Sequence, residues 1–432
     1  MRVGAVQSSP SHQMLDGQSA RNIRVLFLVD EITQSGGVRT RVTEELGCVT
    51  GEEDIQSIVV SRCNIRSIFD IPRAMTYLSA DLGVQKIRGF AYPKIPHGGL
   101  PVLTELSFIL NLAFSVIFLL PLAAMSRVTL VYAHNNEVGL AGILLSRLLG
   151  IACIVDLHGV EIDENFEKHP EWSQTGLRKR FWRAIEGCVA TKSDAIACVS
   201  SKHKDILEGY RGGPGAVHVV PCFANENVFR FRANERETIR KQLAISDDEI
   251  LFVHSGIFRF STDGYDAINL FRQLSRVSSR KLLVLAPDRD TQRRAREFIG
   301  TPIGNQIVVV SCPRKDVTKY LSAADVAILV RKDTIVNRVA SPTKFAEYLL
   351  CGLPVLVSHN IGDSSDIIKE NGLGVVLGDD WVRDPGVLPS EERIRSLVTP
   401  ETRQSCREFA EIRLSRNSWA RTFTGLIRLY SK

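Results

Sequence analysis

The chain has 432 residues, of which 44% are hydrophobic and 24% are charged, and its formal net charge is +6. This composition excludes a disordered chain, and the length suits two α/β domains of about 200 residues each. Because no dense block of lysine and arginine occurs, nucleic acid is not expected as a partner, whereas an anionic ligand or a lipid surface is allowed.

The first residues and the cysteines bear on the compartment of the protein. Residues 1–21 are polar and lack an apolar core, so we expect a flexible tail and not a signal peptide. The nine cysteines include no Cys-x-x-Cys pair and lie mostly in apolar runs. This pattern is typical of buried free thiols in a cytoplasmic protein.

Apolar strands alternate with helical stretches in the first half of the chain. The strand at 23–31 is followed by Gly36 and Gly37, which let the backbone approach a donor ligand, although such a pair also marks ordinary tight turns. Further strands are predicted at 55–61, 128–135, 152–159, 194–200 and 216–223. The alternation predicts a mainly parallel sheet in a Rossmann-like domain over residues 22–223.

Residues 106–125 form an apolar stretch long enough for a transmembrane helix. Asn111 and Pro121 interrupt it, and a strand follows almost at once. We therefore favour a buried or membrane-facing helix over a membrane span.

The charged stretch 224–248 is predicted as a linker between two halves. Strands resume at 249–256, 281–287, 306–312, 325–331, 353–358 and 374–377. They predict a second Rossmann-like domain over residues 249–415, followed by an amphipathic helix at 416–432. Ligands of such folds bind at the carboxyl ends of the strands, so we expect the chemistry in a cleft between the halves.

The segment SPTKFAEYLLCGLPVLVS, residues 341–358, is the most informative part of the chain. Ser341 and Pro342 are predicted as the N-cap and first residue of a helix, which precedes a buried strand. The free amides of a helix start bind anions, and Lys344 adds positive charge there. Glu347 is close enough to reach the ribose of a nucleotide bound at this helix start. A helix with a purely structural role is the alternative.

This segment resembles the signature of retaining GT-B glycosyltransferases of the group 1, or family 4, type. In many members two glutamates separated by seven residues precede a small residue, Gly, Pro and a strand. Glu347 matches the second glutamate, which binds the ribose in the family, whereas the first falls at Val339. The resemblance covers residues 22–432 and implies a GT-B fold. In that fold two Rossmann-like domains face each other, and the helix 416–432 crosses back to the first.

The resemblance assigns candidate roles in the first domain. His158 ends a strand beside Gly159, and a histidine in this setting contacts the donor sugar in the family. We expect it to donate a hydrogen bond to a substrate hydroxyl or to developing charge; tying down its own loop is the alternative. His134 and Asn135 end the preceding strand and are candidate contacts to the acceptor.

In the second domain, Arg259 matches the position of a diphosphate-binding arginine, whose planar fork suits phosphate oxygens. The family often adds a lysine six residues later, but Tyr265 stands there. We expect Lys344 to supply the missing cation, with Arg331 as second choice. Lys332 and Arg338 lie on the same loop.

The remaining candidates surround the donor. Ser341 and Thr343 lie at the helix start, and Gly362 and Asp363 match a glycine-rich turn near the donor sugar in the family. The Asp-Arg-Asp run at 288–290 imitates a metal-binding motif, but we interpret it as a helix start. No metal and no cofactor are therefore expected.

These observations predict a retaining glycosyltransferase that moves a sugar from a nucleotide-diphosphate sugar to a glycan or lipid-linked acceptor, in polysaccharide or glycolipid synthesis. A UDP-sugar is expected in preference to a GDP-sugar. Basic and aromatic residues at 178–183 and the apolar stretch 106–125 suggest peripheral binding to an anionic membrane at its cytoplasmic face. The alternatives are a non-catalytic nucleotide-sugar-binding protein and a nucleotide-sugar epimerase on the same fold.

Overall fold

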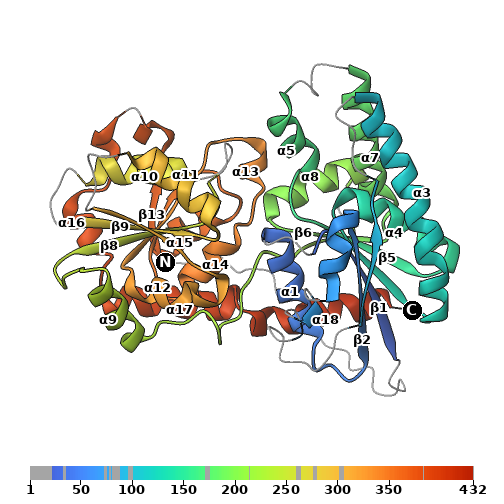
Figure 1. The fold of residues 1–432 in the computed structure, drawn as a ribbon, viewed down its shortest axis with the longest axis horizontal. Coiled ribbons are helices and arrows are strands. Elements are labelled where there is room, and N and C mark those ends of the chain that lie inside the picture. Colours follow the sequence, from blue (N-terminus) through green and yellow to red (C-terminus); the bar gives the residue numbers. More distant parts are fainter. Residues whose placement is uncertain are drawn as a thin grey trace.

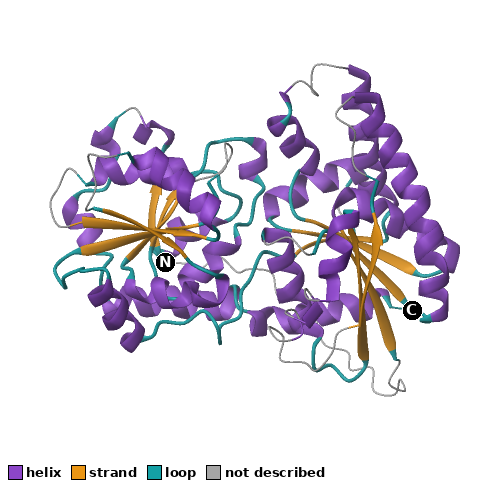
Figure 2. Ribbon diagram, viewed as in Figure 1, coloured by secondary structure: helices purple, strands orange, loops and turns teal. Residues whose placement is uncertain are grey.

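Two parallel sheets, each covered by helices, lie side by side in the computed structural model (Figures 1 and 2). The structure describes residues 22–32, 36–72, 75–76, 79, 88–95, 101–170, 176–213, 215–258, 264–275, 280–300, 306–382 and 384–431.

The first sheet contains seven parallel strands in the order β3-β2-β1-β4-β5-β6-β7. The strand bounds are β1 Ile23–Asp30, β2 Ile55–Cys63, β3 Arg88–Pro93, β4 Leu130–His134, β5 Ala152–Leu157, β6 Ala195–Cys198 and β7 Val217–Val219. The central strands are apolar on both faces because helices cover both, and a separate apolar cluster fills each side. The helices are α1 Gly37–Val49, α3 Pro101–Met125, α4 Asn135–Leu149, α5 Glu161–Lys168, α7 Gly176–Lys192 and α8 Ser201–Arg211, with a short 3-10 helix at Ile65–Asp70.

The second sheet contains six parallel strands in the order β10-β9-β8-β11-β12-β13. The strand bounds are β8 Ile250–Ser255, β9 Arg280–Ala286, β10 Ile307–Ser311, β11 Val326–Leu329, β12 Val355–Ser358 and β13 Gly374–Leu377. The accompanying helices are α9 Ala233–Gln242, α10 Gly264–Leu274, α11 Arg289–Ile299, α12 Val317–Ala323, α13 Ile335–Arg338, α14 Thr343–Leu350, α15 Ser364–Asn371, α16 Glu391–Arg395 and α17 Pro400–Arg413. Short 3-10 helices lie at Arg314–Asp316, Asp379–Val382 and Pro385–Val387.

The last helix, α18 (Arg416–Tyr430), leaves the second domain and packs against α1 of the first (Figure 1). Phe423 and Ile427 are fully buried in the apolar cluster beneath the first sheet. Trp419 stacks on Phe223, and their ring centroids are 6.2 Å apart. The predicted GT-B architecture, including the helix that returns to the first domain, is therefore confirmed.

Three local features differ from the sequence prediction or add to it. Strand β3 was not predicted, because its residues alternate without a continuous apolar run. The range 224–248, predicted as a linker, contains α9, whose Arg236 and Arg240 bind the buried Asp325 of the second domain. Helix α14 begins at Thr343 with Pro342 as N-cap, so the prediction of Ser341 as the N-cap was wrong.

Helix α3 is the one helix of the described residues that is long and apolar enough to cross a membrane, by length and composition alone. Only 28% of its apolar window is buried. Asn111 is buried inside it and exchanges two hydrogen bonds with the backbone of Ile95, at 2.7 and 3.0 Å. The polar residue that interrupts the apolar run therefore fixes α3 to the first domain.

Candidate active site

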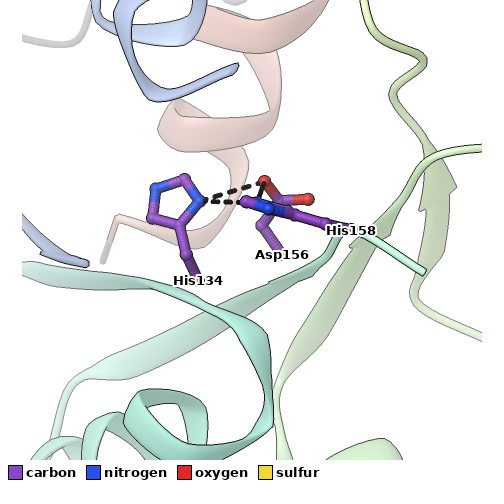
Figure 3. Close-up of side chains that lie close together, drawn as sticks. All are labelled: His134, Asp156 and His158. Atoms are coloured by element: carbon purple, nitrogen blue, oxygen red, sulfur yellow. Dashed lines mark hydrogen bonds and ion pairs between the residues drawn. The ribbon is translucent and has the colours of Figure 1, made fainter. Parts of the chain in front are cut away.

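Three side chains meet at the carboxyl ends of β4 and β5 (Figure 3). His134 ends β4 and lies opposite Asp156 in the parallel register, and His158 directly follows β5. The Nε2 atom of His158 is 3.0 Å from Asp156 Oδ2 and 3.0 Å from His134 Nδ1. His134 Nδ1 is 3.2 Å from the same carboxylate oxygen. The three groups therefore form one compact cluster.

Burial separates the roles of the two histidines. The side chains of His134 and Asp156 are wholly buried, whereas that of His158 is 15% exposed. In this conformation His134 cannot touch an acceptor, so its predicted acceptor contact must be corrected. Its position behind His158 gives it a supporting role. The predicted contact between His158 and a substrate stays compatible with the structure.

Helix α1 supplies the charge that balances Asp156. Arg41 donates from Nε to Asp156 Oδ2 at 2.7 Å and from Nη2 to Oδ1 at 2.8 Å. Burial alone would raise the pKa of Asp156, but the Arg41 charge and the two histidines hold that pKa well below its usual range. Sequence analysis missed Arg41 and Asp156. An aspartate inside an apolar strand was the available signal, because a buried charge requires a partner.

The neighbouring carboxyl group of Glu45 behaves in the opposite way. Burial, and then the charge of Asp156, raise the pKa of Glu45 well above its usual range. Burial also lowers the pKa of His134 to about 4. These opposite shifts leave Asp156 as the carboxylate that carries the negative charge opposite Arg41, whose Nε also lies 3.1 Å from Glu45 Oε1.

The spacing of His134, Asp156 and His158 would also suit a metal ion. Both carboxylate oxygens of Asp156 already accept hydrogen bonds from Arg41. A cation bound there would lie against a buried guanidinium, which like-charge repulsion disfavours. We interpret the cluster as a hydrogen-bond network around His158.

Two further residues flank this network. Asn135 follows β4 in the left-handed backbone region, with φ of 67°, and is partly buried. Glu161, in the first turn of α5, accepts hydrogen bonds from the backbone and side chain of Asn136 at 3.0 and 3.2 Å. Burial raises the pKa of Glu161 to about 7. Sequence analysis did not identify Glu161.

On the side of the second domain, α14 places Lys344 at the carboxyl end of β8. The Lys344 Nζ lies so close to Gly256 that a β-carbon there would be only 2.6 Å away. Gly256 directly follows β8. Tyr265, at the position of the usual lysine, instead packs edge-on against Phe258 and Phe298. Arg259 itself lies outside the described residues.

Glu347 is buried on the first turns of α14 and already has a cationic partner. Its Oε1 accepts a hydrogen bond of 2.6 Å from Nη1 of Arg314. The Arg314 side chain is 47% exposed, lies over the ring of Phe229, and reaches within 4.0 Å of Glu44 in the first domain. Sequence analysis missed Arg314, because it lies in a short loop element far from the signature in sequence.

Several predicted donor-binding residues instead hold the two domains together. Ser341 Oγ accepts a hydrogen bond from the backbone amide of Cys222 at 3.0 Å. Asp363 accepts from the amide and hydroxyl of Ser201 at 2.8 and 2.5 Å, at the start of α8. The carbonyl oxygen of Gly362 accepts from Lys202 Nζ at 2.8 Å. In this conformation these groups bind the first domain.

The remaining candidate residues have other surroundings. Thr343 is the first residue of α14 and is partly buried. Arg331 donates to Asn337 Oδ1 at 3.2 Å. Among the described residues, an added β-carbon at Gly36 or Gly37, at the start of α1, would meet no atom within 4 Å. Asp288 caps α11 by accepting from the amide of Thr291, so the Asp-Arg-Asp run starts a helix as predicted.

Comparison with known proteins identifies a domain and a fold. Residues 60–222 match a family described as glycosyl transferase 4-like domain. No curated protein sequence matches the chain. The structure resembles a sucrose-phosphate synthase from Thermosynechococcus elongatus, with a TM-score of 0.68 and 16% identity over 94% of this chain and 98% of the other.

Two other solved structures have the same arrangement. The Anabaena protein HepE, in complex with UDP and glucose, matches with a TM-score of 0.66 and 14% identity over 94% of this chain and 100% of its own. WaaG, a glycosyltransferase involved in lipopolysaccharide biosynthesis, matches with a TM-score of 0.60 and 14% identity over 93% and 100%. These matches confirm the fold, and the domain match supports the prediction of a glycosyltransferase enzyme.

Proposed function

Because the chain carries a glycosyltransferase domain on a GT-B fold, we propose that it transfers a sugar with retention from a nucleotide-diphosphate sugar to a glycan or lipid-linked acceptor. The position of Lys344 carries this proposal. A cation at the start of α14, against the carboxyl end of β8, suits the charge that develops on a departing diphosphate.

The donor is placed along α14. Its diphosphate is bound by Lys344 and the positive end of the α14 dipole, with Arg259 as a further cation. Its ribose is bound by Glu347. The Glu347 carboxylate must then either bind the ribose and Arg314 together or release Arg314. UDP is the favoured nucleotide, and the binding of UDP and glucose by the structurally similar HepE supports this choice.

The reaction proceeds by attack of the acceptor hydroxyl on the same face from which the diphosphate leaves. The bond between the anomeric carbon and the diphosphate oxygen breaks as the new glycosidic bond forms, and the acceptor proton passes to the departing diphosphate. His158 is the only member of its cluster with an exposed edge among the described residues. It is therefore the group of that cluster that contacts the reacting sugars.

We propose that turnover requires no divalent metal. Lys344, Arg259 and the helix amides supply the positive charge that a metal supplies in other transferases. Turnover should therefore persist in EDTA. A complete loss in EDTA, reversed by magnesium or manganese, would contradict this part of the proposal.

The acceptor side of the protein suits a lipid surface at the cytoplasmic face of a membrane. Helix α3 exposes apolar side chains, with Ile109 51% and Ile117 72% exposed. Helix α7 packs beside its first turns, where Arg178 binds Glu105 and the ring of Trp182 contacts that of Phe108. Not every cation of the basic run at 178–183 can face a membrane, because Arg183 binds Asp163 and Glu186.

Exposed cations remain on α7, the helix that contacts α3 through Arg178 and Trp182. Lys179 and Arg180 are exposed on α7, and Leu177 next to them is 82% exposed. Apolar side chains with neighbouring cations are typical of docking to anionic headgroups. A lipid-linked acceptor would bring this surface and the active site to the same membrane.

A transfer assay with purified protein tests the proposal. Candidate nucleotide sugars are first screened by the increase in melting temperature that each produces. The best donor is then incubated with lipid extracts, and the configuration of the new linkage is determined by NMR. We expect a product with the anomeric configuration of the donor. Conversion of the donor without an acceptor would favour an epimerase, and donor binding without turnover would favour a non-catalytic binder.

A further inference from the structure

The hydrogen-bond network behind His158 determines which nitrogen of its ring carries a proton. Asp156 is ionised and can only accept hydrogen bonds, and its Oδ2 lies 3.0 Å from His158 Nε2. An unprotonated Nε2 would place a lone pair against this carboxylate oxygen. The favourable arrangement therefore has hydrogen on Nε2.

His134 is consistent with the same assignment. Its Nδ1 lies 3.0 Å from His158 Nε2, and two N–H groups would repel each other at that distance. With hydrogen on His158 Nε2, the neutral His134 ring therefore accepts at Nδ1 and carries its own hydrogen on Nε2, which faces Glu45 Oε2 at 3.8 Å. His158 then donates toward Asp156 Oδ2, its nearer acceptor in the buried carboxylate, with the His134 lone pair beside it.

The other nitrogen of His158, Nδ1, lies on the side of the ring away from Asp156. Within the described part of the chain, Nδ1 of His158 makes no hydrogen bond, and it is not among the buried polar atoms that lack one. It is therefore reachable from the solvent side of the ring. In the neutral ring this nitrogen carries a lone pair and accepts hydrogen bonds.

We propose that Asp156, held by Arg41, is a positioning residue that fixes His158 in the tautomer with hydrogen on Nε2, so that His158 Nδ1 accepts a hydrogen bond from a substrate hydroxyl. This inference rests on the proposed transferase function. It reverses the sequence-based expectation that His158 donates. It also predicts specificity, because a substrate group that only accepts hydrogen bonds cannot satisfy Nδ1.

Arg41 is essential to this arrangement because it fills the remaining hydrogen-bond acceptor sites of the Asp156 carboxylate. Its two hydrogen bonds, one to each oxygen, fix the plane of the carboxyl group with Oδ2 facing His158. The groups packed around the cluster come from four elements and the loops that follow them. They are Arg41 and Glu45 on α1, Tyr132 and His134 on β4, Asp156 on β5, and His203 on α8, with Cys222 3.8 Å from Arg41.

The first experiment measures the tautomer directly in the intact protein. The 15N chemical shifts of the His158 ring are recorded by NMR without substrate, at a pH where the ring is neutral. We expect a protonated Nε2 and an unprotonated Nδ1. A protonated Nδ1 would overturn the proposal. This result does not depend on turnover, so it stays distinguishable from a failure of the transferase proposal.

The second experiment is the variant Asp156→Asn, which keeps the shape and allows an amide to donate to Nε2. We expect the 15N spectrum to show the proton moved to Nδ1. With an active donor and acceptor, kcat should fall between about 10-fold and 100-fold, with the donor KM within about twofold. An unchanged tautomer and kcat would contradict the proposal.

Two matched variants separate this effect from loss of stability or of a metal. Asp325→Asn removes the buried carboxylate that binds Arg236 and Arg240, far from His158, and should leave the tautomer unchanged. Glu45→Gln should also leave it unchanged, because no contact joins Glu45 to His158 among the described residues. Should Asp156→Asn not fold, the wild-type spectrum remains decisive. A gain in kcat with added zinc, lost in EDTA, would assign the cluster to a metal and overturn the proposal.

Discussion

The two sides of the proposed active site are built differently. Behind His158, the charged groups are buried and satisfied within the first domain, where Arg41 binds Asp156 through both oxygens. Around α14, the polar groups bind across the boundary between domains, as Ser341 binds Cys222 and Asp363 binds Ser201. The first side is therefore fixed by folding, whereas the second depends on how the two domains meet.

Mutations on the two sides should therefore have different effects. Changes behind His158 should alter stability and the rate of the chemical step, because the geometry there is set before substrate binds. Changes on α14 should alter donor affinity, because Lys344 and Glu347 are expected to contact the donor itself. The Arg314–Glu347 pair lies between these cases, since its arginine is half exposed.

The largest expected effect is the loss of Arg41. Arg41→Met leaves Asp156 buried without its cation, which should lower the free energy of unfolding by about 3–5 kcal/mol. Urea unfolding monitored by circular dichroism measures it. Arg240→Met removes the buried partner of Asp325 and serves as the matched control. A loss below about 1 kcal/mol for Arg41→Met would show that the His158 side is not held by this pair.

Next come the two donor contacts on α14. Lys344→Ala and Glu347→Gln should each weaken nucleotide-sugar binding by about 1.5–3 kcal/mol, because each removes a charge-assisted contact. Isothermal titration calorimetry with the donor gives the two dissociation constants. Lys319→Ala, on α12 where Lys319 pairs with Asp316, serves as the control. Unchanged affinity in both α14 variants would place the donor elsewhere.

Low pH should lower the stability of the first domain, because some of its buried histidines are neutral. Burial lowers the pKa of His203 to about 4, below its value in the unfolded chain. The unfolded state therefore binds more protons between about pH 4 and 6.5, and stability falls as pH falls through this window. His203→Gln should reduce the loss between pH 7 and pH 5 by about 2 kcal/mol.

Denaturant unfolding at several pH values checks the His203 prediction. His169→Gln, at an exposed histidine of the same domain, serves as the matched control. An identical pH slope in wild type and His203→Gln would refute a buried neutral histidine at this position.

The smallest effect concerns the membrane surface on the first domain. The double variant Lys179→Glu and Arg180→Glu should reduce binding to anionic vesicles, since each cation contributes about 1 kcal/mol. Flotation with such vesicles, at low and high salt, measures it. Ile117→Glu should also reduce binding, whereas Ile412→Glu, equally exposed on α17, should not. No binding at any salt, with full activity on a soluble acceptor, would refute the membrane proposal.

The sequence predicted the fold more completely than the site, for physical reasons. Buried parallel strands are continuous apolar runs, so most strands were identified within a few residues. Strand β3, an edge strand with an alternating pattern, gave no such signal. The helix start of α14 was misplaced because Ser341, a good N-cap in sequence, bonds to the first domain instead.

The network behind His158 required the structure. Arg41 and Glu45 lie on a helix of mixed composition, where charged residues are ordinarily solvated, and nothing in their spacing points to burial. The contact of Arg314 with Glu347 joins residues 33 positions apart through the fold. Asp156 in the strand VDL was the one readable signal, because an ionised group in an apolar strand must have a partner.

The comparison between the two sides is tested most directly by measuring donor dissociation constants and kcat in parallel for His158→Ala and Lys344→Ala. We predict that His158→Ala lowers kcat while the donor dissociation constant stays within about twofold of the wild type. Lys344→Ala should weaken donor binding by at least about tenfold. Equal losses of affinity and rate in both variants, or a folding defect alone in His158→Ala, would contradict the account.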